Sequence, residues 1–261
     1  MIGERLTMLG VRASAQAGPA PVRTGSERQP VWVWTGEAAL TVDIPFAGRF
    51  HYSKAELIAD GIVHAVGIVL AVSAGSILLA FSIFHTGPWE FIAAVFYVVS
   101  LLTVLSISCA YNLWPISRAK WILRRFDHAA IFLLIAGTYT PFLAQLDDLT
   151  TARTMIGVVW GAAAIGIAVK LLFPGRFDRL AVVFYLAIGW SGVSITRSVL
   201  DTLPVTTLWL IAAGGIVYST GVVFFAWSAL RFQNAVWHAF VVVAAGLHLA
   251  AVMDCLVINR L

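Results

Sequence analysis

Asp127 is the residue of this chain whose surroundings most strongly suggest chemistry. It follows two arginines and opens a long apolar run, RRFDHAAIFLLIAGTYTPF at residues 124–142. A carboxylate in such a segment is costly, and an ionisable group within a membrane span marks a functional site unless a structural partner explains it. Asp127 could instead cap the N-terminus of its helix, or pair with Arg124 or Arg125. Its partners decide between a functional and a structural role.

Other polar residues recur at a spacing of four near the ends of further apolar segments. They are Glu56, Asp60 and His64 in one segment, Ser108 and Asn112 in a second, and Asn234 and His238 in a third. Residues four apart lie on one face of a helix. Such groups could perform acid–base chemistry or hold a metal ion. They could also complement a helix dipole, cap a helix or bond back to their own backbone.

The elements that must position these residues are membrane-spanning helices. Hydrophobic residues make up 60% of the 261 residues and charged residues only 11%, whereas soluble domains carry about 25% charged residues. Seven stretches approach the ~20 apolar residues that a spanning helix needs. They cover roughly residues 61–84, 90–112, 127–146, 154–173, 179–197, 205–230 and 235–257. No stretch shows the alternation of an outer-membrane strand, so we predict an all-α, seven-helix membrane bundle.

The distribution of basic residues predicts the orientation of the bundle. If the spans alternate in direction, 14 of the 17 Lys and Arg residues fall before the first span and in the connections on that same side. The positive-inside rule then places the N-terminus in the cytoplasm and the C-terminus outside. The formal charge of +4 is therefore a topology signal, and we expect no nucleic-acid partner.

This orientation brings the polar residues together. The first, second, third and seventh spans all place them at their cytoplasmic ends, at similar depth, which is the geometry of one site. Asp127, His238 and Ser108 are the candidate catalytic residues, with Glu56, Asp60 and His64 in support. We see no comparable collection at the outer ends of the spans.

Residues 1–50 differ from the remainder of the chain. They are rich in Gly, Pro, Ser and Arg without periodicity, and they cannot bury enough apolar surface to order themselves. We therefore predict a disordered cytoplasmic tail at 1–50 and a membrane domain at 51–261. The tail lacks the apolar core of a signal peptide.

Three sequence blocks resemble the hemolysin III family, the bacterial branch of the progestin and adipoQ receptor family. They are ELIADGIVHAVG at 56–67, RRFDHAAIFLLIAGTYTPFL at 124–143 and VWHAFVVVAAGLHLAAV at 236–252. The resemblance extends from about residue 53 to residue 258. It implies seven spans with a cytoplasmic N-terminus, in agreement with the bundle predicted above from hydropathy and charge.

The resemblance also implies a buried zinc site. Family members carry Ser-x3-His in the second span, Asp in the third and His-x3-His in the seventh, which fall here on Ser108 and position 112, on Asp127, and on positions 234 and 238. This chain has Asn112 and Asn234, so that only His238 remains of three expected zinc ligands. Amide oxygens are weak zinc ligands. We expect a hydrogen-bonded polar cluster without zinc.

Three functions remain open. The first is a membrane protein of the hemolysin III type that serves membrane homeostasis or lipid sensing through this cluster. The second is a membrane hydrolase of lipid amides or esters, with Asp127 and His238 as acid–base residues around a metal or water. The third is a pore-forming, cytolytic protein. We expect a multi-pass protein of the bacterial inner membrane with lipid as its partner and homo-oligomers as a further option.

Overall fold

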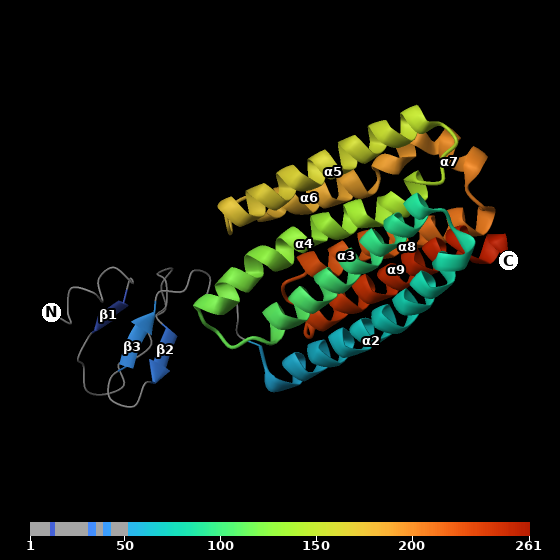
Figure 1. The fold of residues 1–261 in the computed structure, drawn as a ribbon. Coiled ribbons are helices and arrows are strands. Elements are labelled where there is room, and N and C mark those ends of the chain that lie inside the picture. Colours follow the sequence, from blue (N-terminus) through green and yellow to red (C-terminus); the bar gives the residue numbers. More distant parts are fainter. Residues whose placement is uncertain (1–10, 14–30, 35–38, 43–51) are drawn as a thin grey trace. The chain divides into compact units, whose positions relative to one another are not determined.

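Seven long helices dominate the structure, a computed structural model that describes residues 11–13, 31–34, 39–42 and 52–261 (Figure 1). The helical elements are α2 (Lys54–His85), α3 (Pro88–Leu113), α4 (Arg118–Leu143), α5 (Leu149–Leu172), α6 (Asp178–Gly189), η2 (Ser191–Ile195), α7 (Thr196–Thr202), α8 (Val205–Ala226), α9 (Gln233–Leu256) and η3 (Ile258–Arg260). Seven segments are long and apolar enough to cross a membrane, with α6, η2 and α7 together forming the fifth. The predicted all-α, seven-span fold is confirmed.

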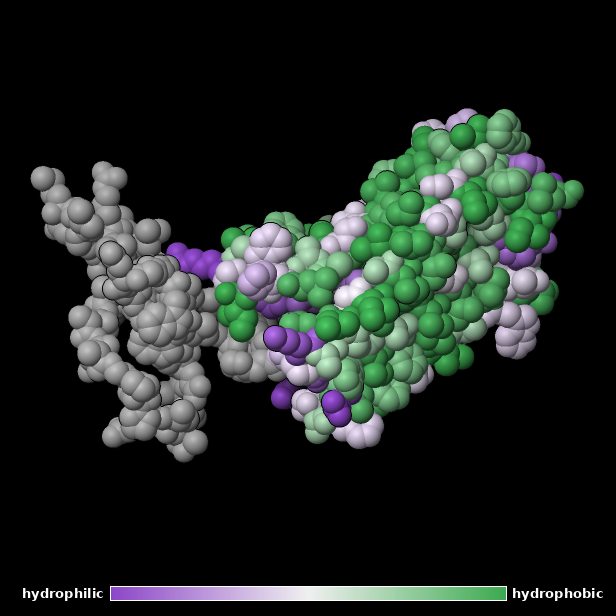
Figure 2. Space-filling model, turned by 90° about the horizontal axis from the view of Figure 1, so that it is seen from below, coloured by the Kyte–Doolittle hydropathy of each residue, from purple (hydrophilic) through white to green (hydrophobic). Residues whose placement is uncertain are grey.

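The outer surface of the helices is that of a protein dissolved in lipid. Large apolar side chains such as Phe84, Trp89 and Trp209 are more than 70% exposed. Figure 2 shows an almost continuous hydrophobic surface along the helices, with hydrophilic residues gathered toward their ends. An exposed apolar surface of this extent would cause aggregation in water, whereas it is the surface expected of a protein that contacts the acyl chains of a bilayer.

The structure corrects the predicted bounds of several spans: α2 begins at Lys54 and not near residue 61, and α8 ends at Ala226 and not near residue 230. α4 begins at Arg118, nine residues before Asp127, because Arg and Lys side chains in its first turns are compatible with a helix that emerges from the lipid. The fifth span is not one continuous helix, since α6 ends at Gly189 and a 3-10 segment follows. The Tyr139 hydroxyl supports this break. It donates to the carbonyl oxygens of Ile188 and Gly189 and accepts from the Gly192 backbone N–H.

Small residues let the helices approach closely. A Cβ atom on Gly67 of α2 would lie 2.7 Å from Val242 of α9, and one on Gly75 would lie 3.0 Å from Val98 of α3. One apolar core joins α2, α3, α4, α8 and α9, and a second joins α4, α5 and α6, so α4 contributes to both. Packing through small residues is the usual basis of helix association in lipid.

Asp148, in the connection before α5, caps the N-terminus of that helix. The Asp148 carboxylate accepts hydrogen bonds from the side chain and backbone of Thr151 and from the backbone N–H of Thr150. These bonds satisfy donors that the first helical turn leaves free. They also hold the pKa of Asp148 below its ordinary value, because they favour the charged carboxylate.

The chain divides into two compact units, of which the smaller contains residues 1–53 and 114–122. Within it, β1 (Val11–Ala13), β2 (Val31–Trp34) and β3 (Ala39–Val42) form an antiparallel sheet in the order β1-β3-β2. The rest of the predicted tail, at 1–10, 14–30, 35–38 and 43–50, lies outside the described residues. Its predicted disorder stays a prediction.

Gly166→Ala is expected to destabilise the protein by about 1–3 kcal/mol, because overpacking forces neighbours to shift. A Cβ atom there would lie 2.4 Å from the Phe132 ring, which is almost fully buried. Gly161 in the same helix is the matched control, since among the described residues no atom beyond its own stretch of helix would lie within 4 Å of a Cβ atom at that position. Gly161→Ala should leave stability unchanged or raise it by up to about 1 kcal/mol. Thermal unfolding in detergent measures both variants, and equal melting temperatures would contradict the expectation.

Candidate functional site

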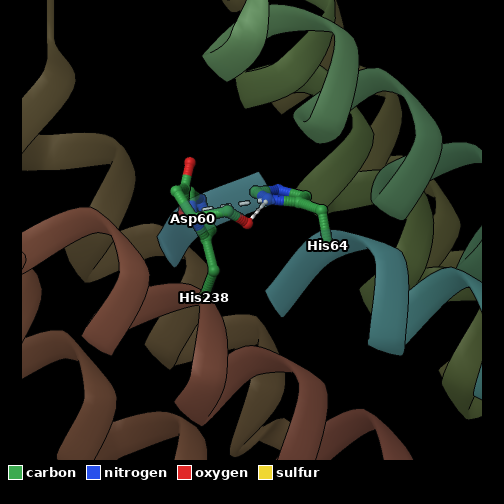
Figure 3. A group of neighbouring side chains, drawn as sticks. All are labelled: Asp60, His64 and His238. Carbon is green, nitrogen blue, oxygen red and sulfur yellow. Dashed lines mark hydrogen bonds and ion pairs between the residues drawn. The ribbon is translucent and has the colours of Figure 1, made fainter. Parts of the chain in front are cut away.

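His238 lies at the centre of a buried cluster of polar side chains from α2, α3 and α9. Its Nδ1 atom lies 2.6 Å from Oδ1 of Asp60. Its ring meets the ring of His64 edge to face, at 4.4 Å between centroids. Figure 3 shows Asp60 and His64 projecting from α2 toward His238 on α9. Asp60 and His64 are each only 2% exposed, so the first span does turn its polar face inward.

The hydrogen bonds fix which ring nitrogens carry protons. A carboxylate only accepts hydrogen bonds, so Nδ1 of His238 donates to Asp60 and, in the neutral ring, Nε2 has a free lone pair. Nδ1 of His64 lies 2.9 Å from the backbone oxygen of Asp60, which also can only accept. The carboxylate of Asp60 thus orients His238, while the Asp60 backbone orients His64.

The other edge of the His238 ring faces α3. Nε2 of His238 lies 3.5 Å from Oγ of Ser108. The Asn112 amide nitrogen donates to the Ser108 backbone oxygen at 2.9 Å and lies 3.3 Å from Ser108 Oγ. The Asn234 amide in turn donates to Oδ1 of Asn112 at 3.4 Å. A line of hydrogen bonds therefore runs from Asn234 through Asn112, Ser108 and His238 to Asp60.

Asp127 joins the cluster from α4 but is not its centre. A side-chain hydrogen bond to Ser108 and charge interactions with His238, Arg124 and Asp60 act on its carboxyl group. Asp127 lies in the interior of α4, so the alternative that it caps the N-terminus of this helix is wrong. The alternative that Asp127 interacts with one of the preceding arginines holds in part, because the positive charge of Arg124 acts on the Asp127 carboxyl group.

Two further acidic residues bind elsewhere at this end of the helices. Glu56 accepts a hydrogen bond from the backbone N–H of Phe232, the residue before α9. Asp178 bridges two buried cations, Arg124 at 2.7 Å and Lys170 at 2.8 Å. From the sequence, Lys170 is a topology signal only, and Arg124 is considered as a partner of Asp127, not of Asp178. Asp178 was the available signal, since it lies next to the boundary of a span and is one of few acidic residues in the chain.

The opposite ends of the helices also carry polar contacts, contrary to expectation. Arg260 forms an ion pair with Glu90, and its guanidinium also donates to Gln145. Thr207 donates to Asp254 at 2.5 Å. These contacts join segments far apart in sequence, so the spacing of residues within one helix could not predict them.

The donors at positions 112, 234 and 238 do not fit zinc. Asn112 and Asn234 offer amide groups that are already hydrogen-bonded to each other and to Ser108, which leaves one imidazole as a strong zinc ligand. Zinc sites require imidazole, thiolate or carboxylate ligands at about 2.0–2.3 Å. The residues at these positions are therefore a weak ligand set for the zinc ion that the family resemblance implies.

A second donor set, Asp60, His64 and His238, has the residue types and proximity to hold a metal ion, with one ligand atom of each within 4.8 Å of the others. However, the Asp60 oxygen and the His238 nitrogen are only 2.6 Å apart. Two ligands of one tetrahedral zinc lie about 3.3 Å apart, because each bond is about 2.0–2.1 Å. The observed spacing is that of a hydrogen bond, and zinc at this nitrogen would have to displace the proton and separate the two groups.

The matches to known proteins cover most of the helical part of the chain. A family model described as "Haemolysin-III related" matches residues 53–249. The chain is 34% identical over 186 residues to "Hemolysin-3 homolog" of Bacillus subtilis, covering 71% of this chain and 87% of that protein. It is 33% identical to "Hemolysin-3" of Bacillus cereus, over 71% of this chain and 85% of that protein. It is also 29% identical to the human "Monocyte to macrophage differentiation factor", over 80% and 87% of the two chains.

Proposed function

We propose, for a chain that belongs to the Haemolysin-III related family, a role in membrane homeostasis or lipid sensing, exerted through the buried polar cluster and without zinc at positions 112, 234 and 238. The observation that carries this proposal is the hydrogen-bond line through His238, which joins α2, α3 and α9. In lipid, such bonds have no water to replace them when they break. Helix displacements caused by a change in the bilayer therefore act directly on the cluster.

Lipid is the partner that the rest of the surface supports. The exposed faces of the helices are apolar along their length, and seven segments suit a multi-pass membrane protein. We assign the chain to the bacterial inner membrane, with the cluster at the cytoplasmic side, as the distribution of Lys and Arg indicates. Assembly into homo-oligomers stays a prediction.

A pore is less well supported than a lipid-responsive cluster. Among the described residues, the buried polar groups of α2 and α9 lie toward the helix ends, and Tyr97 and Ser100 in the middle of α3 donate to backbone oxygens of Ala245 and Tyr97. Between His64 and Ser82 the buried residues of α2 are apolar or glycine, and between His238 and Asp254 those of α9 are also apolar. A conducting path needs polar groups or water across these layers.

The test is the lipid content of cells that contain the full chain. A bacterial strain without its own family member would express the native protein, Asp60→Asn or Ser106→Ala, the last being a control at an exposed position of α3. We expect the native protein and the control to alter acyl-chain order and phospholipid composition after a temperature shift, and Asp60→Asn to behave like empty vector. Equal lipid profiles in all strains would overturn the proposal, as would release of contents from red cells or vesicles by the native protein at the same protein level.

A further inference from the structure

The residues around His238 are arranged as a nucleophile, a base and a positioning acid. Because Nδ1 of His238 donates to Asp60, its Nε2 atom is the acceptor that faces the Ser108 hydroxyl. We propose that Ser108 is a nucleophile activated by His238, with Asp60 as a positioning residue, and that it cleaves the carboxylic ester of a membrane lipid. This inference rests on the lipid partner of the proposed function but not on its sensing role.

The distances suit this assignment. The hydrogen bond of 2.6 Å between His238 and Asp60 holds the imidazole in one tautomer and one orientation, which is what a base next to a serine requires. The Ser108–His238 distance of 3.5 Å is longer than that of an engaged pair. Such contacts are often long without substrate and shorten when it binds.

The two asparagines supply what a serine nucleophile needs beside it. The backbone oxygen of Ser108 accepts from Asn112, so it is the amide nitrogen of Asn112 that faces Ser108 Oγ at 3.3 Å. Asn234 fixes this orientation by donating to the amide oxygen of Asn112. An amide donor is thereby held next to the attacking oxygen. Negative charge in the tetrahedral intermediate develops on the carbonyl oxygen of the ester, and the Asn112 amide stabilises it by turning from Ser108 Oγ to that oxygen.

The negative charge of Asp127 acts on the same three residues, Ser108, His238 and Asp60. Its carboxylate accepts a hydrogen bond from the Ser108 hydroxyl and interacts by charge with His238. Because a hydroxyl has one proton, Ser108 must turn that proton from Asp127 to Nε2 of His238 before it attacks. When His238 accepts a proton, it becomes an imidazolium next to two carboxyl groups, those of Asp60 and Asp127. Both stabilise this cation, which forms as the serine attacks.

The depth of the cluster indicates the substrate class. α2 has 32 residues, or about 48 Å at 1.5 Å per residue, against a hydrocarbon core of about 30 Å. If α2 is centred in the membrane, about 9 Å protrudes at each end, and Asp60 lies about 9 Å from the first residue of α2. That is the boundary between acyl chains and headgroups, where the ester bonds of glycerolipids lie. Ser108 and His238 are 8% and 9% exposed, so these two residues are not completely enclosed by the protein.

The reaction balances with water as the only co-reactant. Ser108 Oγ forms a bond to the ester carbonyl carbon while its proton passes to Nε2 of His238. The carbon–oxygen bond of the ester breaks, His238 returns the proton to the leaving alcohol, and an acyl ester of Ser108 remains. Water then attacks this acyl carbon and gives a proton to His238. His238 passes that proton to Ser108 Oγ as the fatty acid leaves.

Covalent labelling of the purified full chain in detergent tests the assignment. An alkyl fluorophosphonate bonds to an activated serine oxygen and releases fluoride, and peptide mass spectrometry locates the label. We expect native protein and Ser106→Ala to be labelled at Ser108 at the same rate, and Ser108→Ala to lose this label. Asp60→Asn should slow labelling on the order of 10³–10⁴-fold, because it no longer enforces the tautomer. Asp60→Glu should recover part of the rate, which a merely structural loss would not allow.

Several outcomes would overturn the assignment. These are folded native protein that stays unlabelled, a label on another residue, or labelling that 1,10-phenanthroline abolishes, since that result makes a metal the activating group. If Asp60→Asn fails to fold, native protein and Ser108→Ala still decide the matter. A native protein that alters cellular lipids without being labelled would refute the nucleophile alone. Labelling at Ser108 without an effect on cellular lipids would refute the proposed function and support the nucleophile.

Discussion

Purified native protein is expected to hold far less than one zinc ion per chain, and the double variant Asn112→His, Asn234→His to hold about one. The amides at these positions are weak zinc donors, whereas the two substitutions would add two imidazoles beside His238. Three imidazoles are a sufficient protein ligand set for zinc. Elemental analysis after gel filtration in detergent measures the change, which we expect to be the largest binding effect available in this chain.

Two controls separate a rebuilt site from an additional surface histidine. Ser106→His adds an imidazole at an exposed position of the same helix as Asn112 and should not retain zinc. Adding His238→Ala to the double variant should remove the zinc again. Stoichiometric zinc in native protein that is lost with His64→Gln would contradict us, and would assign the metal to Asp60, His64 and His238.

The membrane fold was predictable because lipid imposes few solutions. An apolar stretch of sufficient length must form a helix there, so hydropathy alone located all seven spans. The start of α4 was not predictable in this way. Basic residues lower the hydropathy of its first turns: Arg118, Lys120, Arg124 and Arg125. Two of them are nevertheless accommodated inside the protein, since Lys120 donates to the backbone oxygen of Trp114 and Arg124 pairs with Asp178.

The sequence predicted which residues belong to the candidate site, but not which of them contact one another. Spacing by four placed Asp60 and His64 on one face of α2, yet spacing cannot say whether that face meets lipid or protein. The close approach at Gly67 and Gly75 turns this face inward, and those contacts depend on side chains of α3 and α9. Hence Asp127 looked like the centre of the cluster, while the structure gives that place to His238 and its bond with Asp60.

The bond between Asp60 and His238 is also expected to be the strongest polar coupling between helices in the cluster. We expect Asp60→Ala and His238→Ala each to lower the free energy of unfolding by about 2–4 kcal/mol, because each leaves a buried polar partner without its bond. The double variant should cost less than the sum of the two, by about 1–2 kcal/mol. This lies at the upper end for hydrogen bonds between membrane helices, since the 2.6 Å contact is charge-assisted.

Reversible unfolding of the purified protein in mixed detergent measures this double-mutant cycle. Ser106→Ala paired with Asp60→Ala serves as the reference cycle, since Ser106 is exposed and its effects should add to those of Asp60. Additive costs for Asp60 and His238 would mean that the two side chains do not act as a pair. A coupling close to that of the reference would then remove the basis for both the orientation of His238 and the activation of Ser108, because each depends on the same hydrogen bond.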